Sequence, residues 1–170
     1  NLNLFASKDL VYLNGGPNGG GSGLPDGNYY VQVTEPNGAL LGTSVGSANP
    51  TPAVVVGGVF AQCYQLEAIL IKASNGTPGY DTTSNNGGEY KVWVTPVGDF
   101  SGNDQVVDNG YNPGYFHGFI PAAAKTDNFK VKARSSACLT VSKFLDNGDG
   151  KFDPANEGNL NWPVRVYDAM

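Results

Sequence analysis

The chain is poor in histidine and lacks a recognisable catalytic motif. It contains a single histidine, His117, which lies in the segment Tyr-Phe-His-Gly-Phe with no G-x-S-x-G or comparable nucleophile motif. Paired carboxylates in pocket-like surroundings and a cofactor-binding loop are not recognisable either. These absences predict a protein that is not an enzyme, with His117 as a loop or packing residue.

Positive charge and long apolar runs are also scarce. Ten Lys and Arg residues stand against 15 Asp and Glu, for a net charge of −5, and the basic residues form no stripe. This pattern argues against nucleic acid as a partner. No apolar run has the length of a membrane span, so membrane insertion is not expected. The chain starts at Asn1 without a methionine or a signal-peptide pattern, as expected of a processed mature form or of a piece of a longer protein.

The chain has only two cysteines, Cys63 and Cys138, and both lie in apolar, strand-like runs. They are too far apart in sequence for a CxxC redox motif or a zinc knuckle. They are candidates for a disulfide, and two buried thiols are the alternative that the sequence leaves open.

Glycine and proline, in contrast, are abundant. With 24 and 11 residues they make up about a fifth of the chain, which is typical of short strands joined by tight turns. Alternating or continuous apolar segments predict strands, and residues 60–73 are assigned to a strand although residues 65–72 also suit a helix. A turn is predicted at 125–128 and a long loop at 98–118. The predicted strands are 1–13 (one or two strands), 29–34, 39–43, 52–59, 60–73, 89–96 and 129–133.

These strands predict an all-β fold with two parts. Residues 1–134 form an immunoglobulin-like or jelly-roll-type β-sandwich, in which Trp93 lies on the face opposite to its neighbouring valines. Residues 135–170 supply two further strands, at 138–145 and 163–167, and a loop between them. Because an isolated hairpin is marginal in water, this second part is expected to be an incomplete domain.

The loop at 146–157 carries the clearest chemical signal in the sequence. It reads Asp-Asn-Gly-Asp-Gly-Lys-Phe-Asp, with a glutamate four residues further on. Oxygen ligands at short spacing around glycines are what Ca²⁺ requires, although the EF-hand pattern is not met because Leu145 stands where its first aspartate belongs. A solvated Asx-Gly turn is the alternative. The candidate calcium ligands are Asp146, Asn147, Asp149, Asp153 and Glu157.

Four segments together resemble a known group of proteins. They are GLPDGNYYVQVTEPNG (23–38), NNGGEYKVWVTPV (85–97), HGFIPAAAKTDNFKVK (117–132) and LTVSKFLDNGDGKFDPANEGNLNWPVRVYD (139–168). They are similar to large modular secreted bacterial proteins whose domains resemble the B repeats of serine-aspartate surface proteins and the collagen-adhesin B type. The resemblance implies extracellular display at the cell surface, immunoglobulin-like sandwich architecture and calcium that stiffens the protein.

The incomplete second part leads to a hypothesis about self-association. Unpaired strand edges must be covered, by the first module, by neighbouring β-domains of the same protein or by another copy. We hypothesise that terminal strands pair between copies and build a fibre. The rival hypothesis is a module that binds a glycan or a host matrix protein through an exposed aromatic row formed by Trp93, Tyr90, Tyr111, Tyr115 and Phe116. The candidate exchanged residues are Leu2, Leu4, Phe5, Val164 and Val166.

Overall fold

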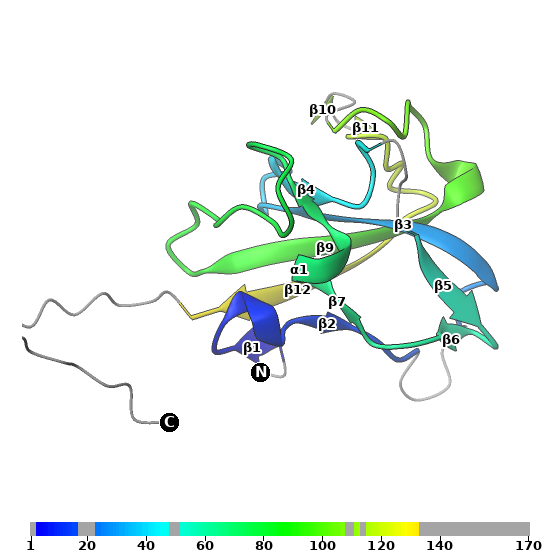
Figure 1. The fold of residues 1–170 in the computed structure, drawn as a ribbon, viewed down its shortest axis with the longest axis horizontal. Helices are drawn as coiled ribbons and strands as arrows, with labels where there is room; N and C mark the ends of the chain where they lie inside the picture. The colour runs from blue at the N-terminus through cyan, green and yellow to red at the C-terminus, as the bar shows by residue number, and fades with distance from the viewer. Residues whose placement is uncertain (1–2, 17–22, 48–51, 108–110, 113–114, 133–170) are drawn as a thin grey trace, which may run out of the picture. The chain divides into compact units, whose positions relative to one another are not determined.

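The structure is a computed structural model, and it describes residues 3–16, 23–47, 52–107, 111–112 and 115–132 (Figure 1). The chain divides into two compact units, Asn1–Ala133 and Arg134–Met170. All of the described residues belong to the first unit. The strands predicted at 138–145 and 163–167 therefore lie outside the described residues.

One eight-stranded sheet organises the described part of the chain, and it confirms the all-β prediction. Six of its strands follow the order β1-β12-β9-β3-β4-β8, while β5 pairs with β3 and β6 pairs with β5. Every pairing is antiparallel except that of β1 with β12, which is parallel. The strands are β1 (Leu4–Phe5), β3 (Gly27–Thr34), β4 (Leu40–Thr43), β5 (Ala53–Val56), β6 (Val59–Phe60), β8 (Ile71–Lys72), β9 (Glu89–Pro96) and β12 (Lys125–Val131).

Shorter elements flank this sheet. In Figure 1 the long strands β3 and β9 cross the middle of the view, with β2 and β7 below them and β10 and β11 above. β2 pairs with β7 and β10 pairs with β11, both antiparallel. These elements are β2 (Tyr12–Leu13), β7 (Tyr64–Gln65), β10 (Tyr111–Asn112), β11 (Tyr115–Phe116), α1 (Leu66–Ile69) and two 3₁₀ turns, η1 (Lys8–Leu10) and η2 (Val97–Asp99).

Both faces of the sheet are buried. Side chains along its central strands point alternately to one face and to the other. One face, here called the valine face, carries Tyr29, Val31 and Val33 of β3 with Tyr90, Val92 and Val94 of β9. It is covered by residues such as Val11, Leu66, Leu70 and Tyr80. The other, here called the tryptophan face, carries Tyr30 and Trp93 and is covered by Phe100, Phe116 and Phe119. Trp93 thus lies opposite to its neighbouring valines, as the alternation predicts.

The predicted hairpin at 29–43 is confirmed as β3 and β4. In the turn, the N–H of Gly38 donates to the carbonyl of Glu35 (2.9 Å), and the N–H of Glu35 donates to the carbonyl of Ala39 (2.8 Å). Gly38 has a φ of 99°, which a residue without a side chain adopts at no steric cost. The Pro-Asn-Gly signal in the sequence therefore has a direct structural cause.

The prediction of one strand over residues 60–73 is wrong. The segment contains the last residue of β6, the whole of β7, the four-residue helix α1 and β8. Leu66 and Leu70 are four residues apart, and each is only 1% exposed. A single helical turn places residues at this spacing on one side, so both leucines enter the valine face. Burial of this pair overrides the strand propensity of the neighbouring residues.

Two further assignments are corrected at the C-terminal end of the first unit. Residues 125–128 are the first half of β12, not a turn, because they pair with residues 91–94 of β9. Their polar side chains fit a strand that lies near the edge of the sheet and is half exposed. The predicted loop at 98–118 contains β10 and β11, which form a short ribbon.

Tyr30 on the tryptophan face gives the first testable prediction. Its hydroxyl donates to a carboxylate oxygen of Asp104 (2.7 Å). Burial is the largest cause that raises the pKa of Tyr30 to about 12, and this hydrogen bond is the second. A raised folded-state pKa means that the stabilisation is complete below the unfolded value near 10 and is lost as pH rises toward 12. We expect urea-unfolding free energies to fall across pH 10–12, and to fall less in Tyr30→Phe. An equal fall in both proteins contradicts the prediction.

Candidate functional site

The edge of the sheet at β12 is a candidate site for binding another chain. β12 pairs with β9 along most of its length, but on its other side β1 covers only Lys130 and Val131. The N–H of Lys130 donates to the carbonyl of Asn3 (2.7 Å), and that of Lys132 donates to the carbonyl of Phe5 (2.9 Å). Among the described strands, none pairs with residues 125–127 on the side away from β9. An incompletely covered edge is a template for strand addition.

The two residues of β1 face opposite ways. Phe5 points inward and contacts the ring of Phe129 edge-on, with centroids 6.2 Å apart. Leu4 lies on the outer side and is 52% exposed. Of the residues predicted for strand exchange, Phe5 is therefore the inward anchor and Leu4 is not, while Leu2, Val164 and Val166 lie outside the described residues.

Phe129 forms the receptor for Phe5. Its ring stacks on Tyr90 with centroids 5.1 Å apart, and Tyr80 meets it edge-on at 6.2 Å. Tyr80 is fully buried, and burial raises the pKa of its hydroxyl strongly, so it is neutral at physiological pH. These rings form a rigid apolar surface, here called the aromatic socket (Tyr80, Tyr90 and Phe129).

A polar contact stands beside the aromatic socket, two residues before Phe5. The side-chain amide of Asn3 donates to a carboxylate oxygen of Asp127 (3.1 Å) and to the carbonyl of Asn128 (2.9 Å). The other carboxylate oxygen of Asp127 accepts from the N–H of Asn128 (2.8 Å). Side chains thus satisfy both the C=O and the N–H of Asn128. These groups point away from β9, as those of Lys130 do, because every second residue of a strand directs its backbone groups to the same side.

A hollow of about 210 Å³ lies under this contact, between the sheet edge and β2. Asn3, Asn14 and Asp127 supply polar groups around it. Its apolar lining includes Phe5, Leu13, Leu66, Val92 and Phe129. The hollow suits the side chain of an extended segment, because it combines an apolar lining with hydrogen-bonding groups beside a strand edge.

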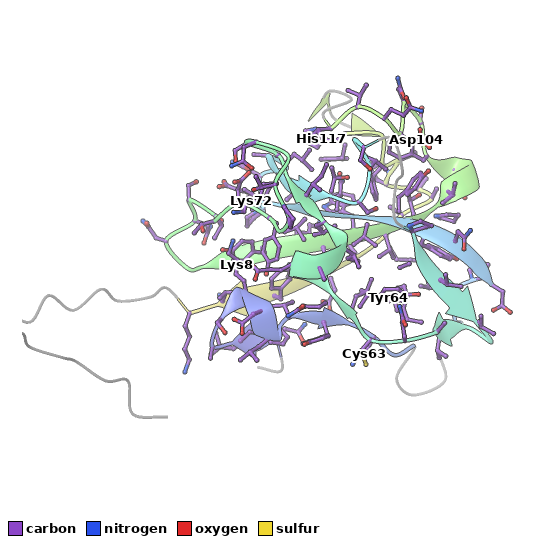
Figure 2. The ribbon with its side chains drawn as sticks, in the orientation of Figure 1. Lys8, Cys63, Tyr64, Lys72, Asp104 and His117 are labelled. Carbon is purple, nitrogen blue, oxygen red and sulfur yellow. The ribbon has the colours of Figure 1, made fainter. Side chains whose placement is uncertain are left out.

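Lys8 fixes the chain directly after this strand. Its ammonium group donates to the carbonyl of Tyr80, lies 4.6 Å from the centre of the Tyr80 ring, and is 3.9 Å from a carboxylate oxygen of Glu67. Burial lowers the pKa of Lys8 from its usual value, and the Glu67 carboxylate opposes this effect. Figure 2 shows Lys8 beside the helix and the central strands. Only Ala6 and Ser7 separate Lys8 from β1.

His117 is a packing residue, as the sequence predicts. It is 5% exposed, and its Nε2 lies 2.9 Å from the carbonyl of Gly38 in the turn between β3 and β4. Its φ of 51° makes it the only described residue other than glycine in the left-handed region. His117 therefore links the segment after β11 to the turn between β3 and β4 (Figure 2).

The alternative of two buried thiols fails for Cys63, which is exposed (Figure 2). The amide of Asn14 contacts its sulfur at 3.7 Å. The other cysteine, Cys138, lies outside the described residues, so the disulfide stays a prediction.

The exposed aromatic row is not present as predicted. Tyr90 and Trp93 are buried on opposite faces of the sheet, and Trp93 stacks on Phe116 with centroids 4.8 Å apart. Trp93 also donates from its indole nitrogen to the hydroxyl of Thr34 (3.0 Å). The side chains of Tyr111 and Tyr115 lie outside what the structure describes. Binding of a glycan or a matrix protein stays a prediction, but the predicted aromatic row does not support it.

The predicted calcium ligands, Asp146, Asn147, Asp149, Asp153 and Glu157, all lie outside the described residues. Within those that are described, no group of three or more His, Cys, Asp or Glu side chains gathers as a metal site. Asp104, in the segment before β10, accepts a hydrogen bond from the hydroxyl of Tyr30. No helix of the described part is long and apolar enough to cross a membrane.

Sequence reasoning missed three residues of this site: Asn3, Lys8 and Asp127. Asp127 lies in the polar segment 125–128, which has no apolar alternation that would extend the predicted strand at 129–133. Asn3 and Lys8 carried no signal of their own, since their hydrogen-bond partners Asp127 and Tyr80 are 124 and 72 residues away in the sequence.

Comparisons with known proteins give no match: no family model, no curated protein and no solved structure corresponds to this chain. The resemblance to the serine-aspartate surface proteins and the collagen-adhesin B type stays a prediction.

Proposed function

We propose that this chain is part of a non-catalytic extracellular structural or adhesive protein whose copies join by exchanging the N-terminal strand. The observation that carries the proposal is the placement of β1. It is a two-residue parallel strand at the edge of the sheet, with an aromatic anchor seated against the aromatic socket. Such a strand is easily released and replaced by an identical strand from another copy.

The energetics favour exchange of this segment over exchange of a larger one. The strand from another copy makes the same contacts as β1, so the difference between the closed and exchanged forms is set by the connecting residues and by concentration. Releasing β1 leaves β12 paired with β9 along six residues, so the sheet persists. The cost of opening is therefore confined to the Asn3, Phe5 and backbone contacts.

The proposal also includes the finer parts of the sequence prediction. They are a sandwich of immunoglobulin-like or jelly-roll type, display at the cell surface, and Ca²⁺ held by the loop at 146–157. In this proposal calcium stiffens the second unit and makes assembly of the whole chain calcium-dependent.

A disulfide trap tests the proposal in the full chain. Leu4 and Lys130 are register partners on one face, so Leu4→Cys with Lys130→Cys reports the β1–β12 pairing once Cys63→Ser and Cys138→Ser remove the native thiols. Within one chain the pair forms a monomeric disulfide. With exchange, we expect disulfide-linked dimers and higher species on non-reducing gels, rising with protein concentration and further with millimolar calcium.

The matched control places the second cysteine at Thr126, on the same face but four residues out of register. Leu4→Cys with Thr126→Cys is expected to give less than a tenth of the linked species. Monomeric disulfides alone at millimolar protein, with and without calcium, would refute strand exchange. If the amount of disulfide-linked species does not change with calcium, only the calcium part of the proposal is refuted.

A further inference from the structure

We propose that Asn3 is the residue that sets the register of the exchanged strand, and that its partner is Asp127 of a second copy of this chain. This inference rests on the proposed strand exchange and specifies what the receptor edge recognises. The recognised unit is an asparagine followed, two residues later, by phenylalanine. Asn3 meets Asp127 and Asn128, and Phe5 meets the aromatic socket.

A register-setting contact is needed because the pairing is very short. Two paired residues supply few backbone hydrogen bonds, and the outward groups of β12 repeat every second residue. A slip by two residues would keep the faces of the strand while moving Phe5 off the aromatic socket. A slip in one direction sets Phe5 beside the Asp127 carboxylate and removes its amide donor. A slip in the other direction brings Asn1 to this carboxylate but sets the polar amide of Asn3 against the aromatic socket.

Asp127 suits this role because its two oxygens are divided between two tasks. One accepts from the N–H of Asn128 and so caps the backbone where pairing with β1 stops, and the other accepts from Asn3. The carboxylate is thus held in place before the strand arrives. A preorganised acceptor selects a donor such as an amide and rejects a second carboxylate.

Lys8 limits how much of the chain is exchanged. Its contacts with Tyr80 and Glu67 hold η1 on its own subunit, and Ser7 has an extended backbone with φ −155° and ψ 165°. Ala6 and Ser7 therefore form the connection between the exchanged strand and its own subunit. The exchanged segment ends at Phe5, and the register contact and the aromatic anchor both fall inside it.

A charge swap tests the register role without requiring assembly. Asn3→Asp sets a second carboxylate against Asp127, and we expect hydrogen exchange of the Lys130 and Lys132 amides to accelerate at least tenfold. Adding Asp127→Asn restores a donor to the pair and should recover most of that protection. Asn28→Asp adds the same charge at an exposed site in β3 and should leave these amides unchanged. Unchanged amides in Asn3→Asp would overturn the proposal.

A mixing experiment tests the same contact between copies. One chain carries Asn3→Asp with Leu4→Cys, the other carries Lys130→Cys with or without Asp127→Asn, and both lack the native thiols. We expect at least tenfold more of the mixed disulfide when the receptor carries Asp127→Asn. Equal amounts with both receptors would overturn the register role and leave exchange intact. No mixed disulfide at all, together with the expected amide results, would refute exchange and leave the register role standing within one chain.

Discussion

Phe129→Ala is expected to lower the free energy of unfolding by about 3–5 kcal/mol, the range for removing a buried phenylalanine. Phe129 is buried and contacts the rings of Phe5, Tyr80 and Tyr90. Alanine would leave a cavity in the aromatic socket, where these three rings now contact Phe129. Urea unfolding followed by tryptophan fluorescence measures the loss.

Phe129→Leu is the matched comparison, because it keeps an apolar side chain in the same place. We expect a loss of about 1–2 kcal/mol, smaller than for alanine since most of the volume is retained. If both substitutions cost less than about 1 kcal/mol, then Phe129 is not a central packing residue and the aromatic socket is wrongly assigned.

The second large effect is expected at Gly42, in the middle of β4. A side-chain carbon added there would lie 2.6 Å from Cβ of Tyr80, 2.9 Å from Cα of Tyr80 and 3.1 Å from the carbonyl oxygen of Gly79. Two of these three atoms belong to the backbone and cannot swing away. Gly42→Ala should therefore destabilise the fold by about 3 kcal/mol, at the upper end of the usual cost of overpacking.

Gly98→Ala is the control for this substitution. Gly98 lies in η2, and an added carbon would meet no atom within 4 Å. Its alanine variant should be neutral or stabilised by up to about 1 kcal/mol, since alanine restricts the unfolded chain. Equal stabilities for the Gly42→Ala and Gly98→Ala proteins, measured by thermal unfolding, would contradict the close approach of β4 and residues 79–80.

The sequence predicts the strands whose pattern is local. Residues 89–96 alternate along their whole length, and β9 has these same bounds. The hairpin at 29–43 is equally readable, because Pro-Asn-Gly provides its turn within a few residues of both strands. In these segments the burial pattern and the local propensity agree, so a single sequence is enough.

The parts that could not be predicted depend on distant contacts. The helix α1 buries Leu66 and Leu70 in the valine face, whereas the local pattern of residues 65–72 suits both a helix and a strand and does not decide between them. The site has the same origin. Asn3 meets Asp127 across 124 positions of sequence, and Lys8 meets Tyr80 across 72. Polar residues at such separations look like ordinary surface residues until the fold brings them together.

The pairing of β1 with a different strand, β12, has a geometric consequence for growth. The surface that gives the strand and the edge that receives it are different surfaces, so a one-way exchange joins unlike ends of two molecules. An assembly built in this way has two chemically distinct tips, one with an unoccupied edge and one with an unattached strand. Elongation would then have a polarity, and short peptides spanning residues 3–5 would stop growth at only one tip.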